Sequence, residues 1–391
     1  MEHYIFYCKL SLLAVLSLIT ACCMLSRRWY VNLAAFLACL SGETFLAHLF
    51  FPGYMLCPAA ASFIILFLSR IWDLSRTSAK GNGADPIRLP VRSGIRESRL
   101  EFHYHYSNFL VYGGAGSGKT KSIGKWLLSE YMRLGFAGFI YDFKDTDYTC
   151  TAYNLIKRHR YPHKFYYVSF DRPERSYRFN PLKVVRDRTE LIQLMEDVLL
   201  ALLPKKEQQN EWVAGGLGIL RGVAFRFWDE FPEHCTLPHI LAFIMTASAR
   251  QLSLFLQQNL VSEMLAGAYL KAEGSEKTQA SYLSTLCNNL ATISQNEEIA
   301  YVLSGDDFDF NLIDPENPKL FAVSNNFSKN SVYAPVISML MTISARQFSM
   351  QNRVPFVYFL DEMTTVNIKN FETLPSVLRE YKAAFILLTQ S

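Results

Sequence analysis

A glycine-rich octapeptide in the first third of the chain has the composition of a phosphate-binding loop. It is Gly113-Gly114-Ala115-Gly116-Ser117-Gly118-Lys119-Thr120, of the form G-x-x-x-x-G-K-T. Glycines let the backbone approach an anion closely, and successive N–H groups beside a helix N-terminus cradle phosphate oxygens. The Lys119 ammonium would reach the β and γ phosphates, and the Thr120 hydroxyl would hold Mg²⁺. These residues predict a site for ATP with Mg²⁺.

Asp361 and Glu362 supply the acids that such a site needs. They follow five apolar residues, Phe356-Val357-Tyr358-Phe359-Leu360, a pattern typical of a buried parallel strand. Acids at the carboxyl end of such a strand face the ligand crevice. Asp361 would position Mg²⁺ and its waters, and Glu362 would polarise the attacking water. The alternative is that Asp361 only caps a helix, and the upstream loop favours the catalytic interpretation.

The elements that must position these residues alternate between strands and helices. Phe109–Tyr112 predicts a strand that leads into the loop, and the residues from Lys121 predict a helix. Further strands are expected at 137–142, 164–170 and 319–324, whereas 187–305 is helical in its apolar spacing. The sequence therefore predicts an α/β core that is interrupted by an all-α domain.

The first 72 residues predict a membrane region. The whole chain of 391 residues is 50% hydrophobic with a net charge of +4, and between Leu10 and Ser69 the only formal charges are Arg27, Arg28 and Glu43. Three spans, at about 10–25, 31–50 and 51–69, place the arginine pair inside. Two spans, at about 5–25 and 54–72, leave Glu43 in water instead. Both versions place the rest of the chain in the cytoplasm.

The predicted organisation has five parts. They are a transmembrane region at 1–72, a linker at 73–100, a first nucleotide-binding part at 101–186, an all-α inserted domain at 187–305, and a second nucleotide-binding part at 306–391. Eight cysteines are present without a C-x-x-C pair, which argues against a disulfide scaffold or a zinc ribbon.

Several further motifs resemble those of the type IV coupling proteins, the TraG/TraD-like membrane ATPases of bacterial conjugation. Tyr141-Asp142-Phe143-Lys144 is similar to the family's Asp-x-Lys element, and Phe179-Asn180-Pro181-Leu182 to its Asn-Pro-Leu. Leu378-Arg379-Glu380-Tyr381 and Leu388-Thr389-Gln390-Ser391 are similar to its Arg-x-Tyr-Gly and Gln-Ser elements. With the membrane region, the loop, the helical insertion and the acidic pair, the resemblance covers essentially the whole chain.

The resemblance implies a RecA-like P-loop NTPase core that assembles as a homo-hexamer at the bacterial inner membrane. Such a protein would receive single-stranded DNA bound to a relaxase, contact the inner-membrane components of a type IV secretion system, and drive DNA transfer with ATP. Arg379 matches an arginine that reaches the nucleotide of the neighbouring subunit. Gln390 matches a glutamine that links the γ-phosphate to conformational change.

Two positions depart from the family pattern. Lys382 stands where the family has the glycine of Arg-x-Tyr-Gly, and the sequence ends at Ser391, where relatives continue. The core is therefore expected to be truncated at its C-terminus. Two other functions stay open: an FtsK-like membrane DNA translocase, and a truncated receptor or scaffold that binds ATP without turnover.

One basic and aromatic cluster stands apart from these motifs. It comprises Lys157-Arg158-His159-Arg160 with Tyr161, His163 and Lys164. Such a cluster either contacts a DNA backbone or an acidic lipid or is a solvated helix end.

Overall fold

The computed structural model describes residues 85–390 except 94–95, 115, 145, 204–205 and 369, together with parts of 5–15 and 40–50. The chain divides into two units, Met1–Ala84 and Asp85–Ser391, and each is considered by itself. In the first unit the described residues are helical. No helix among them is long and apolar enough to cross a bilayer. Most residues of the predicted spans lie outside the described residues, so the spans stay a prediction.

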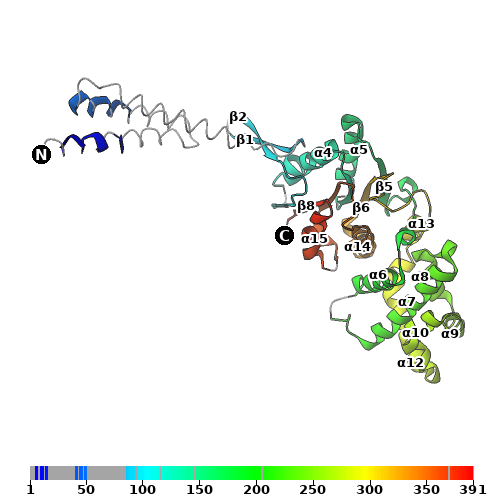
Figure 1. Ribbon diagram of the computed structural model, residues 1–391. Coiled ribbons are helices and arrows are strands. Elements are labelled where there is room, and N and C mark those ends of the chain that lie inside the picture. Colours follow the sequence, from blue (N-terminus) through cyan, green and yellow to red (C-terminus); the bar gives the residue numbers. More distant parts are fainter. Residues whose placement is uncertain are drawn as a thin grey trace. The chain divides into compact units, whose positions relative to one another are not determined.

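A six-stranded parallel sheet forms the centre of the second unit (Figure 1). Its order is β3-β8-β7-β4-β6-β5, and β4, β6 and β7 are buried at every position. This burial is typical of a parallel sheet that carries helices on both faces. The strands are β3 (Phe109–Tyr112), β4 (Ala137–Asp142), β5 (Lys164–Ser169), β6 (Lys319–Ser324), β7 (Phe356–Asp361) and β8 (Ala383–Thr389).

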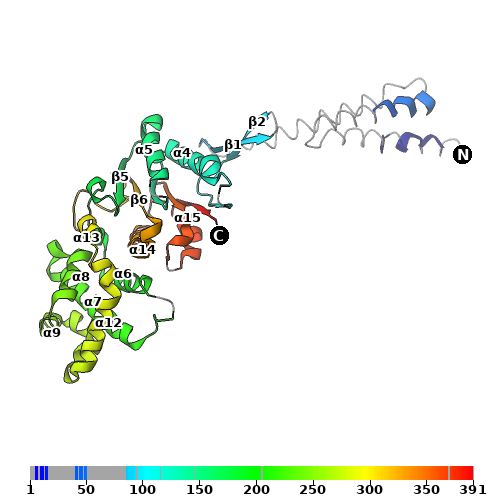
Figure 2. The ribbon, with the colours of Figure 1, turned by 180° about the vertical axis from the view of Figure 1, so that it is seen from behind.

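Helices cover both faces of this sheet (Figures 1 and 2). Because side chains alternate along a strand, Ile140 and Phe359 belong to the hydrophobic cluster of the first helix pair, and Phe139 and Tyr358 to that of the second. The first pair is α4 (Lys125–Arg133) and α5 (Asp147–His159), and the second pair is α14 (Asn330–Arg346) and α15 (Leu374–Glu380). The core is therefore an α/β layer structure, as the sequence predicts.

The region between β5 and β6 is helical. Its first helix begins with Asp187 as the N-cap, whose side chain accepts a hydrogen bond from the Glu190 N–H. The chain enters and leaves this region side by side, since the Phe179 N–H donates to the Val302 carbonyl at 2.8 Å. The helices are α6 (Arg188–Ala201), α7 (Glu211–Glu230), α8 (Leu237–Thr246), α9 (Ala249–Gln257), α10 (Leu260–Leu265), α11 (Gly267–Lys271), α12 (Glu276–Ser294) and α13 (Glu297–Leu303).

An antiparallel hairpin precedes the core and lies partly within the segment interpreted as a linker. It is formed by β1 (Ile87–Ser93) and β2 (Arg96–Phe102). Its inward residue Ile87 is fully buried, and the Arg88 N–H donates to Glu130 of α4 at 2.9 Å. Residues 87–93 and 96–100 of the predicted linker are therefore in strands, and Ile87, Leu89 and Phe102 join the hydrophobic cluster of α4. Residues 73–84 lie outside the described residues.

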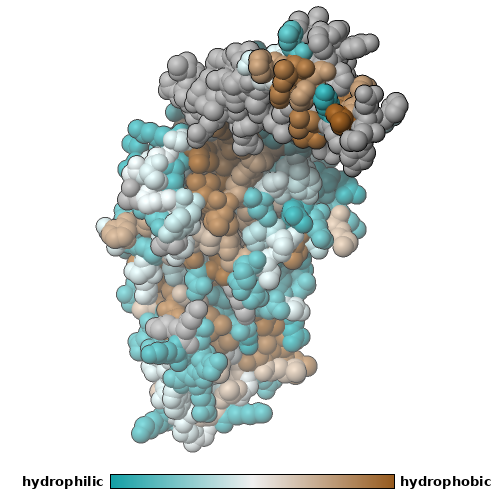
Figure 3. Space-filling model, turned by 90° about the vertical axis from the view of Figure 1, so that its left-hand side faces the viewer, coloured by the Kyte–Doolittle hydropathy of each residue, from teal (hydrophilic) through white to brown (hydrophobic). Residues whose placement is uncertain are grey.

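The strand that leads into the glycine-rich loop lies at one edge of the described sheet. β3 pairs with β8 alone among the described strands. Leu110 and Tyr112 of β3 are 69% and 70% exposed. The backbone of β3 on its outer side has no strand partner among the described residues. Figure 3 shows that apolar side chains gather in a band on one face of the molecule. The β3 edge is thus an apolar surface with unpaired backbone groups, a combination that favours further pairing.

Candidate nucleotide-binding site

The loop from Gly113 to Thr120 adopts a conformation that depends on glycine. Gly116 and Gly118 have φ of +74° and +83°, values that side chains disfavour. The Lys119 ammonium folds back and donates to the carbonyl of Gly113. Thr120 begins a π-helical turn that runs to Gly124 and continues into α4. Strand, loop and helix N-terminus therefore follow one another as anion binding requires.

The remaining loop residues predicted to bind phosphate are placed on the same turn. Gly113 extends the pairing of β3 with β8, since its N–H donates to the Thr389 carbonyl at 3.3 Å. The Ser117 N–H donates to the carbonyl of Gly114 at 3.3 Å. Ala115 lies outside the described residues.

Asp361 ends β7 and is nearly buried, with 4% of its surface exposed. One of its oxygens, Oδ2, has no hydrogen-bond partner among the described residues. Burial raises the pKa of Asp361 to about 7, and the nearby positive charge of Lys144 opposes this shift. A buried carboxylate oxygen without a donor is costly unless a cation or a proton meets it. Hard cations such as Mg²⁺ prefer this kind of ligand, so Asp361 suits the predicted metal role.

Asp142 lies beside Asp361 on the neighbouring strand. β4 and β7 pair with Tyr141 opposite Leu360, so the two aspartates are successive neighbours at the carboxyl ends of these strands. Asp142 Oδ2 accepts hydrogen bonds from the N–H and the hydroxyl of Thr149, at 2.8 and 2.9 Å. Its Oδ1 has no partner among the described residues, and burial raises its pKa. The site therefore contains a second buried acid.

The sequence did not identify Asp142 as an acid of the nucleotide site. Asp142 was recognised only as part of the Asp-x-Lys element, without a function. The signal that could have revealed the role is the position of Asp142 after the apolar residues 137–141, because the carboxyl ends of neighbouring parallel strands share one edge of the sheet.

Glu362 is held by the end of strand β8. Its φ is +51°, so the chain turns sharply directly after Asp361. Its Oε1 accepts the backbone N–H of Gln390 at 3.0 Å and lies 3.5 Å from the Thr389 hydroxyl, which also donates to it. The structure therefore brings Glu362 and Gln390 together, as two of the predicted site residues at the ends of adjacent strands.

A chain of hydrogen bonds connects the loop after Glu362 with the ends of the neighbouring strands. The Thr365 hydroxyl donates to the Glu362 carbonyl at 2.7 Å and shares a 2.6 Å hydrogen bond with the Tyr141 hydroxyl. Asn325, which follows β6, donates to the same Tyr141 oxygen at 2.8 Å. The carboxyl ends of β4, β6 and β7 are thus joined around the acidic pair.

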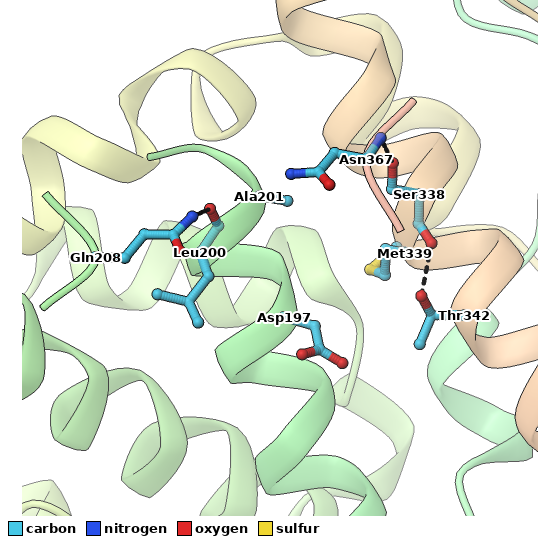
Figure 4. A pocket seen from close by; sticks show the side chains of 8 residues that line it. All are labelled: Asp197, Leu200, Ala201, Gln208, Ser338, Met339, Thr342 and Asn367. Atoms are coloured by element: carbon cyan, nitrogen blue, oxygen red, sulfur yellow. Dashed lines mark hydrogen bonds between the residues drawn. The ribbon is translucent and has the colours of Figure 1, made fainter. Parts of the chain in front are cut away.

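The same loop reaches the helical region at a cavity of about 180 Å³ (Figure 4). The Asn367 N–H donates to Ser338 Oγ of α14 at 3.2 Å. Asp197 of α6 lies across the cavity and forms an ion pair of 2.7 Å with Arg346 of α14. Helix α14 therefore contacts both the loop after β7, through Ser338, and α6, through Arg346.

Arg379 lies apart from the acidic pair, on the surface of α15. Its side chain is exposed and has no hydrogen bond or ion pair with other described residues. Lys382, three residues later, has a φ of +65°. The turn from α15 into β8 needs the left-handed backbone conformation at this position, which explains why the family has a glycine there.

The Asn-Pro-Leu element has a structural role at the entry to the helical region. Asn180 is 5% exposed, and its side-chain oxygen accepts the N–H of Leu182 at 3.1 Å. Its amide donates to the carbonyl of Cys235 at 2.8 Å, just before α8. Asn180 thus ties the core to the helical region.

The basic and aromatic cluster at 157–164 is only partly available to a ligand. His159 Nε2 shares a hydrogen bond of 2.8 Å with Ser129, and His163 Nε2 one of 2.8 Å with the Gly135 carbonyl. The Tyr161 hydroxyl is buried and donates to the Phe136 carbonyl. Burial lowers the pKa of both histidines. The exposed members are the four cations Lys157, Arg158, Arg160 and Lys164.

Conjugative coupling proteins of known structure share this fold. The bacterial conjugative coupling protein TrwBdeltaN70, in a trigonal form with sulphate, matches with a TM-score of 0.56 and 16% identity, over 73% of this chain and 63% of that chain. The plasmid coupling protein TrwB matches with the same TM-score and identity in complex with ADP and Mg²⁺, and in complex with the ATP analogue ADPNP. The likeness shows the fold alone, an α/β core built on a parallel sheet.

This chain spans less than two thirds of the length of those solved structures, 63% in the first. No curated protein matches it in sequence. Residues 83–391, which include the loop, the acidic pair and the whole helical region, match the family described as type IV secretory system conjugative DNA transfer. Because this match covers most of the sequence, the chain belongs to the conjugative DNA transfer family of the type IV secretory system.

Proposed function

We propose that this chain is the coupling ATPase of a conjugative type IV secretion system. It recruits relaxase-bound single-stranded DNA and drives its transfer by hydrolysing ATP. The observation that carries this proposal is the position of Asp361 and Glu362, which end β7 in the same parallel sheet whose strand β3 leads into the glycine-rich loop. The family match supports the assignment to conjugation.

Each residue of the site has a separate role in the proposed hydrolysis of ATP. The N–H groups of the loop and the Lys119 ammonium bind the phosphates and offset the charge that develops during phosphoryl transfer. The Thr120 hydroxyl and Asp361 would hold Mg²⁺, which would supply positive charge to offset that of the phosphates. Glu362 accepts a proton from the attacking water. Its hydrogen bond from Gln390 couples this position to the end of β8.

The assembly is proposed to be a homo-hexamer. The support is Arg379, which is exposed on α15 and has no partner among the described residues. An arginine presented on the surface in this way can reach a nucleotide held by a neighbouring subunit and stabilise the transferring phosphate. Catalysis at one loop would then depend on the adjacent copy.

The location is proposed to be the bacterial inner membrane, with the NTPase domain in the cytoplasm. The support is the apolar sequence of residues 10–69, together with the pair Arg27 and Arg28 within it and Arg70 directly after it. At this location the N-terminal segment would contact the inner-membrane components of the secretion system, and the core would face the relaxase and its DNA.

Nucleotide hydrolysis by the detergent-purified chain tests the function. Turnover is measured without DNA, with single-stranded DNA and with duplex DNA of equal length. The proposal expects single-stranded DNA to raise kcat by more than duplex DNA does. Stronger stimulation by duplex DNA would favour an FtsK-like translocase. ATP binding without turnover under every DNA condition would favour a receptor or scaffold.

A further inference from the structure

A groove of about 700 Å³ runs between α5, β5 and the segment that follows β5. It lies away from the glycine-rich loop, because β5 forms the edge of the described sheet opposite to β3 and four strands lie between them. Thr149, which lines the groove, is also the residue that donates to Asp142 of the nucleotide site. Nothing in the roles proposed for Lys119, Asp361, Glu362, Arg379 and Gln390 uses this groove.

The groove combines aromatic rings with positive charge. Tyr153 and Tyr177 are 62% and 43% exposed. Arg175 is exposed as well, and its nearest ion-pair contact is a loose one of 4.0 Å to its chain neighbour Glu174. None of the described residues that line the groove carries a carboxylate. Its aromatic and positively charged lining residues are Tyr153, Phe165, Tyr167, Arg172, Arg175 and Tyr177. The lining therefore offers stacking surfaces and cations together.

The positive charge continues beyond the groove along the same elements. Tyr153 and Lys157 stand four residues apart on α5, so they lie on one face of the helix. Lys157 and Arg158 in the last turn of α5 are exposed, as is Lys164 at the start of β5. Lys157 thus extends the positive charge of the groove along α5, whereas Lys164 alternates with Phe165 and points to the other face of β5.

We propose that this groove binds single-stranded DNA, with bases stacked on Tyr153 and Tyr177 and phosphates paired with Arg175 and Lys157. Unpaired bases present both faces to aromatic rings, and cations track the backbone between them. A duplex keeps its bases stacked internally and cannot use the tyrosines in this way. The inference rests on the proposed function, which makes single-stranded DNA the cargo, and deepens it by naming where the DNA is held.

Cys150 gives a direct test, because it is exposed and lines the groove. The full chain is alkylated with and without saturating oligothymidylate, and modification of each cysteine is followed by peptide mass spectrometry. DNA at about ten times its Kd should slow alkylation of Cys150 about tenfold, since about nine tenths of the sites are occupied. Cys287 in the helical region serves as the internal control, and its rate should not change.

Substitutions give the second measurement. The double variant Tyr153→Ala/Tyr177→Ala should weaken binding of oligothymidylate about tenfold or more in fluorescence anisotropy. Arg175→Gln should lower the slope of log K against log salt by about one unit or less. The matched control is Tyr104→Ala, because Tyr104 is also exposed, at 55%, and lies in another part of the core. Because Tyr177 packs on Tyr166, its substitution could disturb the fold. The single variant Tyr153→Ala leaves that contact intact, so weaker binding by this variant cannot be attributed to its loss.

The outcomes separate this inference from the proposed function. Unchanged affinity in the tyrosine variants, or reactive Cys150 while DNA is bound, overturns the groove and leaves the coupling ATPase standing. Protection of Cys150 in the assembled protein before DNA is added also overturns it, because a neighbouring copy would then cover the groove. Absence of any DNA binding by the wild-type chain overturns both.

Discussion

The backbone N–H of Gln390 donates a hydrogen bond to the side chain of Glu362 over 3.0 Å. The two residues follow adjacent strands, β8 and β7. This bond fixes the carboxylate beside the end of β8, and it makes the position of each residue depend on the other. A group that polarises water at one strand end is thereby coupled to the neighbouring strand end.

Glu362→Gln should keep the fold and abolish most turnover. The glutamine side chain still offers an oxygen to the Gln390 N–H, but it cannot accept a proton from water. We expect kcat to fall about 10²–10⁴-fold, with the affinity for an ATP analogue unchanged. Steady-state kinetics and equilibrium binding of a fluorescent nucleotide measure the two quantities. A kcat within a few fold of wild type would exclude Glu362 as the base.

Asp361→Asn should stabilise the nucleotide-free protein at neutral to basic pH. Burial raises the pKa of Asp361 to about 7 in the folded protein. The folded state therefore binds the carboxyl proton more tightly than the unfolded state does, and the stability that this gives is full below about pH 4 and is lost as the pH rises through about 7. The amide carries no charge at any pH. Since one pKa unit corresponds to about 1.4 kcal/mol, the variant should gain up to a few kcal/mol at pH 8.

Urea denaturation at pH 5 and pH 8 checks this expectation. The stability difference between Asp361→Asn and wild type should be larger at pH 8 than at pH 5. An equal difference at both pH values would mean that the carboxyl is not raised in pKa. The variant should also lose Mg²⁺-dependent turnover, because an amide is a weaker ligand for a hard cation.

Arg379 should act between subunits. Arg379→Ala subunits keep an intact loop, and Lys119→Ala subunits keep the arginine. When equal amounts are mixed, roughly a quarter of the interfaces in a random ring combine an intact loop with an intact arginine. Turnover should therefore appear in the mixture and be absent from either variant alone. Full activity of Arg379→Ala by itself, or no recovery on mixing, would contradict the assignment.

Lys382→Gly should stabilise the core. Lys382 has a φ of +65° between α15 and β8, and this conformation costs a residue with a side chain about 1–2 kcal/mol. Part of the gain is offset because glycine adds entropy to the unfolded chain. We expect a net gain of about 0.5–1 kcal/mol in urea denaturation. Lys382→Ala is the matched control, and it should give no gain, because alanine keeps a Cβ.

The nucleotide loop and its strand could be predicted from the sequence because the signals are local. The loop from Gly113 to Thr120 lies directly between β3 and a helix in the chain. The five apolar residues before Asp361 likewise identify β7 without reference to any other segment. Both predictions depend only on neighbours in sequence, and both elements lie where they were expected.

The sheet order could not be predicted in this way. β8 lies between β3 and β7, although it is the last strand in the chain. Its apolar residues 383–388 resemble those of the other strands, but the sequence analysis interpreted only its end. Strand order is set by hydrogen bonds between segments that are far apart in sequence, and periodicity within one segment carries no information about them.

The position of Asp142 beside Asp361 could not be predicted from the sequence for the same reason. It depends on the register between β4 and β7, two strands on either side of the helical insertion. The left-handed backbone of Glu362 and its bond to Gln390 also depend on tertiary contacts. The residue types and their local order therefore predicted which residues form the site. How these residues lie relative to one another could be seen only in the folded structure.

Hydrolysis of ATP by Lys119→Ala, measured beside wild type and Lys121→Ala, tests whether the loop from Gly113 to Thr120 is the site of ATP hydrolysis. Lys121 is exposed and lies just after the loop, so it controls for loss of a nearby positive charge. With single-stranded DNA present, we expect turnover at background level for Lys119→Ala and at the wild-type level for Lys121→Ala. Undiminished turnover by Lys119→Ala would show that the loop from Gly113 to Thr120 is not the site of hydrolysis.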